Sequence, residues 1–284
     1  MRRPPGRAEI AQLLRGHGLH PSKALGQHFV ADPNTVERIA RLARVGPGDR
    51  VVEIGAGLGS LTVALAATGA AVTAIEVDRG IVPVLREIVE PLGVSVVEAD
   101  AMSCDWSALL SESPRWVLVA NLPYNVATPL VVDLLRCVPV IERMLVMVQR
   151  EAGERLVAAP GADLFGAVSL RVSYFAKATL VGRVPPGVFV PRPNVESVLV
   201  EVVRRESPAL DPALARYEEI DVLLRAGFGG RRKMLRRSLE GLVGPEEFDA
   251  AGVDGRARAE ELDLEAWGKL VACRRSKHCA LPPS

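Results

Sequence analysis

The stretch VVEIGAGLG, residues 51–59, decides how the rest of the chain is interpreted. Its first four residues form a short, largely apolar run, which is typical of a parallel strand buried on both faces. Glycines follow at once, and a helical stretch comes after them. Glycines at such a turn let the backbone approach a ligand closely at the carboxyl end of the strand. The stretch therefore predicts an α/β fold with a binding turn at this edge of its sheet.

Six further runs have the same strand character, and helical stretches separate most of them. They are Val72–Ile75, Val94–Val97, Val117–Ala120, Met144–Val148, Thr179–Val184 and Ser197–Val203. Asp32-Pro33 predicts a helix start, with Asp as the N-cap and Pro at the first helical position. Seven strands with helices between them predict a Rossmann-like, doubly wound domain around a mostly parallel sheet.

The pattern changes after Arg205, where apolar residues return only at helical spacing. We expect two domains, an N-terminal arm with the α/β domain over 1–204 and a small helical domain over 205–284 that ends in a flexible tail. Cys273, His278 and Cys279 in this tail are too few for a zinc site, so we expect a disordered tail and no metal.

The composition is that of a globular protein, with 49% apolar and 24% charged residues among 284. Aromatic residues make up only 4%, which argues against an aromatic platform for stacking RNA bases. The chain shows no secretory signal and no membrane-spanning run, and its four cysteines are scattered. These features favour a reduced, cytoplasmic setting without a membrane partner.

The net charge of +1 hides an uneven distribution of charge along the chain. Residues 1–28 carry five basic and one acidic side chain, residues 29–204 carry sixteen and nineteen, and residues 205–284 carry fourteen of each. Five basic residues lie within seven positions, namely Arg231, Arg232, Lys233, Arg236 and Arg237. Basic charge at these two places indicates an anionic partner, and favours a large polyanion over a small acid.

The turn at Gly55 and Gly57 has acidic partners at the ends of the next two strands. Glu76 lies 21 residues after Gly55, where a carboxylate can accept hydrogen bonds from ribose hydroxyls. Asp100, after the third strand, could accept from an adenine amino group. Ser60 replaces the third glycine of the dinucleotide fingerprint, so a cofactor with ribose but no pyrophosphate fits better, and S-adenosylmethionine is the common one. A turn that only packs helix on strand is the alternative.

Two more acids flank the same edge, Glu53 and Asp78, and each could serve either as a structural hydrogen-bonding group or as a ligand contact.

Asn121-Leu122-Pro123-Tyr124 follows the fourth strand at the same edge. An asparagine oxygen and the Leu122 carbonyl could accept both hydrogens of an adenine amine, which draws the nitrogen toward the tetrahedral geometry it needs to attack a methyl group. The Tyr124 ring could stack on the base. A β-turn with a buried tyrosine is the alternative.

These motifs together resemble the small-subunit ribosomal RNA adenine N6-dimethyltransferases, the KsgA-type enzymes. The resemblance covers roughly residues 23–240 and rests on five motifs in order. They are KALGQHFV at 23–30, EIGAGLGSLT at 53–62, NLPY at 121–124, FxPxPNVxS at 189–197 and FxxRRKxLR at 228–236. The resemblance implies a class I S-adenosylmethionine-dependent methyltransferase that dimethylates two adjacent adenines near the 3′ end of small-subunit rRNA during subunit assembly.

The resemblance also implies roles for individual residues. Cofactor contacts would fall on His28, Val30, Gly55, Glu76, Asp100 and Asn121, with Gly57 in the same turn, although relatives often have asparagine in place of His28. Phe189 would stack on a flipped or unpaired target base opposite Tyr124. RNA contacts would fall on Lys23 near the N-terminus and on Arg231, Arg232, Lys233 and Arg236. The last group would lie on a helix whose other face carries Leu235 and Leu239. A solvated basic face is the alternative for this last group.

Three other functions compete with this interpretation. One is a large-subunit rRNA methylase that confers macrolide resistance, against which the segment from Phe228 to Arg236 argues. Another is a non-catalytic RNA-binding assembly factor, against which Asn121 and Tyr124 argue. An NAD-dependent oxidoreductase is disfavoured by Ser60. We expect a monomer that acts on a pre-ribosomal particle.

Overall fold

The computed structural model describes residues 2–123, 126–230 and 232–279, with side chains up to residue 275. Contacts divide the chain into two compact units. The first unit holds residues 1–153 and 179–204, and the second holds residues 154–178 and 205–284. The sequence predicts a single boundary between the two domains, after residue 204. The chain also crosses between the units within helix α7 (Arg150–Val157) and strand β7 (Ala176–Val184), because residues 154–178 pack with the C-terminal helices.

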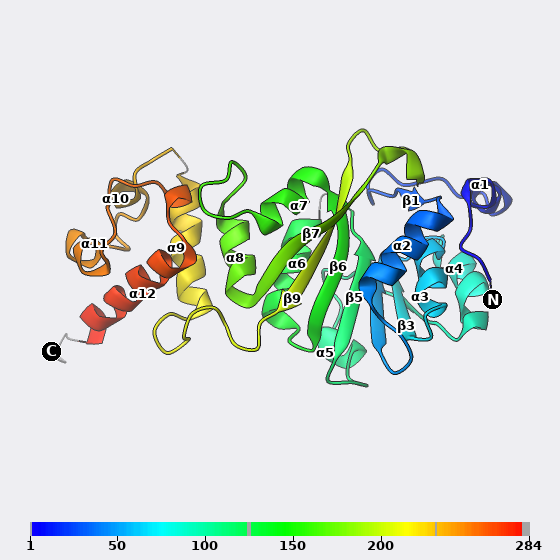
Figure 1. Cartoon of the computed structure of the whole chain (residues 1–284), viewed down its shortest axis with the longest axis horizontal. Helices are drawn as coiled ribbons and strands as arrows, with labels where there is room; N and C mark the ends of the chain where they lie inside the picture. The colour runs from blue at the N-terminus through cyan, green and yellow to red at the C-terminus, as the bar shows by residue number, and fades with distance from the viewer. Residues whose placement is uncertain (1, 124–125, 231, 280–284) are drawn as a thin grey trace. The chain divides into compact units, whose positions relative to one another are not determined.

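The first unit is built on a seven-stranded sheet with strand order β4-β3-β2-β5-β6-β9-β7 (Figure 1). Strands β2 to β6 pair in parallel, and β9 pairs antiparallel with β6. The strands are β2 (Arg50–Ile54), β3 (Ala71–Glu76), β4 (Ser95–Glu98), β5 (Trp116–Asn121), β6 (Ile141–Gln149), β7 and β9 (Ser197–Arg204). Each of the seven predicted runs overlaps one of these strands, so the doubly wound sheet is confirmed.

One helix precedes the first strand of the sheet, and the others fill the connections between its parallel strands, as a parallel sheet requires. They are α2 (Pro33–Ala43), α3 (Ser60–Ala66), α4 (Val82–Val89), α5 (Trp106–Leu109) and α6 (Ala127–Cys137), with a 3₁₀ turn at Glu90–Leu92. Helix α2 begins where predicted, because the Asp32 side chain accepts from the Thr35 N–H at 2.9 Å and Pro33 occupies the first turn. Its face with Val36, Ile39, Ala40 and Ala43 is buried in the core.

The N-terminal arm carries helix α1 (Arg7–Gly16) and a short strand, β1 (Phe29–Val30). Strand β1 pairs antiparallel with β8 (Phe189–Val190), which follows a 3₁₀ turn at Pro186–Val188. This two-stranded ribbon ties the segment before α2 to the loop before β9, two regions 160 residues apart in the sequence. The arm is therefore part of the first unit rather than a loose extension.

The second unit is helical. Its elements are α8 (Ala167–Phe175), α9 (Tyr217–Gly229), α10 (Leu235–Ser238), α11 (Pro245–Ala251), a 3₁₀ turn at Ala259–Glu261 and α12 (Leu264–Cys279). Leu223, Leu224, Leu235, Leu239 and Trp267 form its buried centre. Helix α12 runs through Cys273 to Cys279, so the expected disorder of this part of the tail is wrong. Within the described residues, no helix is both long and apolar enough to cross a membrane.

Candidate active site

The glycine turn after β2 is held against the neighbouring strand. Gly55 and Gly57 have φ angles of 71° and 56°, which favour glycine. The Gly55 and Ala56 N–H groups both donate to the Ile75 carbonyl on β3, at 2.9 and 3.2 Å. A Cβ on Gly57 would lie 2.9 Å from the Phe29 ring. Both the backbone conformation and this close approach therefore require glycine at position 57.

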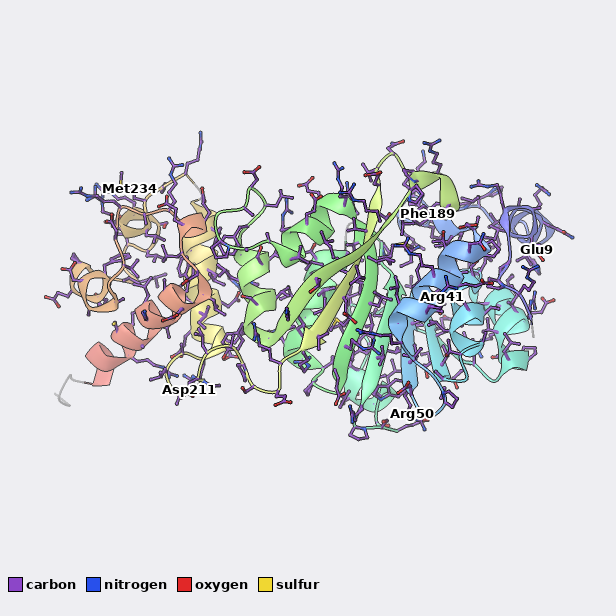
Figure 2. All side chains as sticks on the ribbon, in the orientation of Figure 1. Glu9, Arg41, Arg50, Phe189, Asp211 and Met234 are labelled. Atoms are coloured by element: carbon purple, nitrogen blue, oxygen red, sulfur yellow. The ribbon has the colours of Figure 1, made fainter. Side chains whose placement is uncertain are left out.

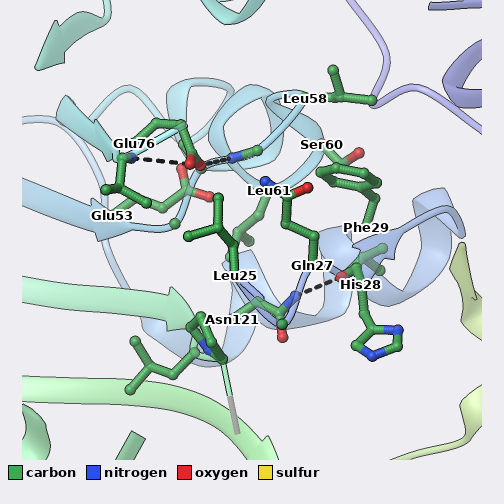
Figure 3. Close-up of a pocket in the computed structure, with 18 residues that line it drawn as sticks. Leu25, Gln27, His28, Phe29, Glu53, Leu58, Ser60, Leu61, Glu76 and Asn121 are labelled. Atoms are coloured by element: carbon green, nitrogen blue, oxygen red, sulfur yellow. Dashed lines mark hydrogen bonds between the residues drawn. The ribbon is translucent and has the colours of Figure 1, made fainter. Parts of the chain in front are cut away.

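Glu76 ends β3 and is only 5% exposed. One of its oxygens accepts from the Gly57 N–H at 2.7 Å, and the other accepts from Val77 at 3.0 Å and Asp78 at 2.9 Å (Figure 3). Burial raises the pKa of Glu76, and these three backbone donors work against that rise. A carboxylate has about four acceptor positions. Three are used here, which leaves capacity for one hydroxyl donor from a ligand in the pocket that Glu76 lines.

Glu53 on β2 is still more buried, at 1% exposed, and lines the same pocket. Burial raises its pKa to about 8, the charge of Glu76 adds to the rise, and the Thr62 hydroxyl opposes it. Within the described chain, its Oε2 atom has no hydrogen bond. Burial therefore favours the neutral, protonated form of Glu53. The sequence had left this residue undecided between structure and ligand, since the pattern alone does not show how deeply it is buried.

Residues 25–30 of the N-terminal arm form the opposite wall of this pocket. The Gln27 amide spans the gap: its nitrogen donates to Asp78 at 2.7 Å, and its oxygen accepts from the Ser22 N–H at 2.7 Å. The hydrogen bond from Gln27 to Asp78 thus holds the arm across the pocket from the glycine turn. Sequence reasoning did not single out Gln27 or Leu25, although both lie inside the KALGQHFV motif.

Asn121 closes the pocket from the end of β5. Its side-chain nitrogen donates to the His28 carbonyl at 3.0 Å, and the His28 ring contacts the Pro191 carbonyl through Nδ1 at 2.8 Å. The Leu122 N–H donates to Met147 on β6 at 3.0 Å, which fixes the turn to the sheet. The Pro123 carbonyl then accepts from Val126 and Ala127 as α6 begins. Tyr124 lies outside the described residues.

These residues surround two adjoining hollows. The first, of about 90 Å³, is lined by the predicted His28, Val30, Gly55, Gly57, Glu76, Asn121 and Leu122. The second, of about 170 Å³, is lined by Asp100 together with apolar side chains such as Ile75, Met102 and Leu130. The hollows share Leu25, Gly55, Val77 and Pro123. The structure therefore brings the predicted cofactor residues together, with Asp100 in the neighbouring compartment.

Phe189 is buried in this structure. Its ring is 1% exposed and packs in the core of the first unit, and the residue lines neither hollow. Phe189 is labelled in Figure 2. The pairing of Val30 with Phe189 turns the side chain inward. In this structure the ring is a core side chain, and its stacking on a target base stays a prediction.

The predicted basic helix is also shorter than expected. Leu235 and Leu239 are fully buried, as the pattern required. Helix α10, however, begins only at Leu235, so Arg232 and Lys233 lie in the exposed bend before it and only Arg236 and Arg237 are helical. Arg231 is outside the described residues. In the first unit, Lys23 is exposed two residues before Leu25, which lines the first hollow, and the Lys23 carbonyl accepts from the Gly26 N–H at 3.1 Å.

Comparison with known proteins gives the family. The model of the ribosomal RNA adenine dimethylase family matches residues 19–273. A ribosomal RNA small subunit methyltransferase A from Cutibacterium acnes is 44% identical over 278 residues, covering 93% of this chain and 92% of the relative. The protein of the same name from Kineococcus radiotolerans is 42% identical, covering 94% of this chain and 90% of the relative.

Solved structures agree with this placement. A dimethyladenosine transferase from Plasmodium falciparum matches with a TM-score of 0.72 and 26% identity, covering 86% of this chain and 96% of that one. The 23S rRNA methyltransferase ErmE matches with a TM-score of 0.67 and 26% identity, covering 87% and 99%. The sheet is therefore that of a class I S-adenosylmethionine-dependent methyltransferase, and the chain belongs to the ribosomal RNA adenine dimethylase family.

Proposed function

We propose that this protein transfers methyl groups from S-adenosylmethionine to N6 of two adjacent adenines near the 3′ end of small-subunit rRNA, and that each adenine receives two. One observation carries the proposal. Asn121 and Leu122 line the same pocket as the Gly55–Gly57 turn and Glu76. An acceptor pair suited to an adenine amine thus adjoins a turn suited to a ribose-containing methyl donor.

The residues present fit S-adenosylmethionine. Glu76 retains one acceptor position for a ribose hydroxyl, because its other three are used by backbone N–H groups. The second hollow has apolar walls suited to a flat heterocycle, and Asp100 lines it as an acceptor for an amino group. Gly55, Gly57, His28 and Val30 would hold the cofactor through close backbone approach. When bound, the cofactor supplies a methyl group on a positively charged sulfur.

The chain's own residues then prepare the amine. The lone pair of an adenine amine is delocalised into the ring, so the nitrogen is a poor nucleophile until it becomes tetrahedral. The Asn121 oxygen and the Leu122 carbonyl accept its two hydrogens and favour that geometry. The hydrogen bond from Asn121 to His28 orients the amide beforehand, so little reorganisation is needed in the transition state. By its resemblance to the family, Tyr124 is the residue that stacks on the base.

The substrate is large, and its phosphates must be bound away from the pocket. Arg231, Arg232, Lys233 and Arg236 contact rRNA from the second unit, and Lys23 contacts it from the first. We expect a monomer that acts in the cytoplasm on a pre-ribosomal particle. The relatives at 42–44% identity carry the small-subunit name, whereas the large-subunit enzyme matches at 26%, which favours the small-subunit substrate.

A methyl-transfer assay tests the proposal. Small-subunit particles from a strain that lacks this methylation are incubated with the protein and tritiated S-adenosylmethionine, with large-subunit particles in parallel. Mass spectrometry then locates the methyl groups. We expect dimethyladenosine at two adjacent positions of small-subunit rRNA. Label on large-subunit rRNA alone would assign the resistance activity instead, and binding without label would indicate an assembly factor.

A further inference from the structure

A groove lined by arginines lies between the N-terminal arm and helices α2 and α3 of the first unit. It measures about 500 Å³. Its charged lining consists of Arg2, Arg3, Arg41, Arg44 and a single acid, Glu37. Arg2 and Arg3 belong to the basic segment 1–28, whereas the sum over residues 29–204 is negative and gives no sign of Arg41 and Arg44 on the facing wall. It is separate from the cofactor pocket, because the two share no lining residue.

The groove is a built feature of the fold. Pro4 lines its wall and is buried together with Pro5, while Ile10 and Leu14 of α1 anchor the rest of the arm in the core. The Arg2 guanidinium donates to the Ile88 carbonyl at 3.4 Å. Packing therefore holds this part of the arm on the first unit, where Arg2 bonds to α4 and both arm arginines line the groove. Figure 2 marks Arg41 on α2, which forms the facing wall.

The charges of the groove are only partly balanced. Arg44 forms an ion pair with Glu201. Arg2 bonds to a neutral carbonyl, which leaves its charge uncompensated. Arg3 and Arg41 are exposed, and within the described part of the chain their side chains form no hydrogen bond or ion pair. Concentrated positive charge over low-dielectric walls focuses the field and attracts anions.

Arg44 adds a second observation. It is the only non-glycine residue with positive φ in the described chain, at 50°, and it caps the end of α2. Glycine is the residue favoured at such a left-handed cap. Arg44 therefore adopts a backbone conformation that disfavours it, and its guanidinium, which lines the groove, is paired with Glu201.

We propose that this arginine groove binds the phosphodiester backbone of the rRNA substrate, as a second RNA contact on the first unit beyond the basic segment of the second. That the bound polyanion is rRNA depends on the function proposed above. Guanidinium groups suit phosphate because their planar donors bind its oxygens in pairs. A row of phosphates also matches several arginines along a groove better than one small anion does.

Salt titration of binding to unmethylated small-subunit particles tests the proposal. The variant is Arg3→Gln with Arg41→Gln, which keeps side-chain length and removes two charges. The matched control is Arg115→Gln with Arg136→Gln, two exposed arginines on the same unit that are paired with Glu142 and Asp133. We expect the slope of log affinity against log salt to flatten by about 1.4–1.8 for two lost contacts, with affinity roughly tenfold weaker. The control should retain the wild-type slope.

Two further measurements distinguish phosphate binding by the groove from a purely structural role of its arginines. Arg41 lies in the last turn of α2, where a cation also stabilises the helix end. A lowered melting temperature with an unchanged slope would assign the arginines to that structural role and overturn the proposal. Cofactor affinity should stay at the wild-type value. Methylation by the wild-type protein, measured in parallel, tests the proposed function by itself. If the wild-type protein methylates the particle but both variants keep the wild-type salt slope, the groove proposal is refuted and the proposed function stands.

Discussion

The pocket edge of the first unit and the basic segment of the second unit, residues 231–237, are both rich in polar side chains but are built in opposite ways. At the pocket edge Glu53 and Glu76 are buried, and Glu76 accepts three backbone hydrogen bonds. In the basic segment, Arg232, Lys233 and Arg236 are exposed over a buried leucine pair. Buried groups in fixed positions stabilise a ligand or a transition state at short range. Exposed charges contribute a weaker attraction that salt screens. Changes at the edge should therefore be large and specific, and changes in the segment small and salt-dependent.

The largest expected effect is on the rate after Asn121→Ala. The acceptor matters most as the amine becomes tetrahedral, so the single-turnover methylation rate should fall at least tenfold, about 1.4 kcal/mol in the barrier. Cofactor and RNA affinities should change less. Quench-flow with tritiated cofactor measures the rate. A rate within about threefold of wild type would remove Asn121 from the assigned role.

The second largest effect is expected after Glu76→Ala, which should weaken cofactor binding. Loss of hydrogen bonds to a charged acceptor should weaken binding by about 1.5–3 kcal/mol. Calorimetry measures the affinity, and circular dichroism verifies that the variant is folded, because Glu76 also supports the N–H groups of Gly57, Val77 and Asp78. Glu98→Gln is the matched control, since Glu98 is the exposed register neighbour of Glu76 on β4. Equal affinity in both variants would exclude Glu76 from the cofactor site.

Glu53 should give the first unit a pH-dependent stability. Its folded pKa of about 8 lies above the ordinary value of 4.5, so the folded state keeps a proton that the unfolded chain releases. Stability from this group is thus lost as pH rises between these values, by at most about 1.4 kcal/mol per pH unit. Glu53→Gln cannot ionise and should flatten this part of the profile. Urea unfolding from pH 5.5 to 8.5 compares the two, and parallel profiles would mean that Glu53 is ionised in the folded protein.

The smallest effect is expected in the basic segment. Arg232→Gln with Arg236→Gln should flatten the salt slope of binding to the small-subunit particle by about 0.7–0.9 per lost phosphate contact, with cofactor affinity unchanged. Arg216→Gln with Lys269→Gln is the control, because both residues belong to the second unit and are paired with Glu219 and Glu265. Slopes parallel to wild type in both variants would show that this segment does not touch RNA.

The sequence by itself determined the sheet and the edge at which the pocket lies. Apolar runs, the Asp32 cap and the glycine turn are local signals, because strand burial, capping and positive φ depend on a few neighbouring residues. The sequence also predicted that Gly55, Glu76 and Asn121 lie close together, because the carboxyl ends of parallel strands share one edge of the sheet. Residues 154–178, in contrast, gave no local sign that they pack with the C-terminal helices.

Only the tertiary structure decided where long-range contacts place each side chain. The pairing of β1 with β8 buries Phe189, and neither segment predicts the other because 160 residues separate them. The burial that raises the pKa of Glu53 depends on elements packed around β2. The arginine groove needs Arg3 of the arm beside Arg41 of α2, with only Glu37 to offset them. Charge summed along a chain cannot show this, because electrostatic attraction depends on distances in space.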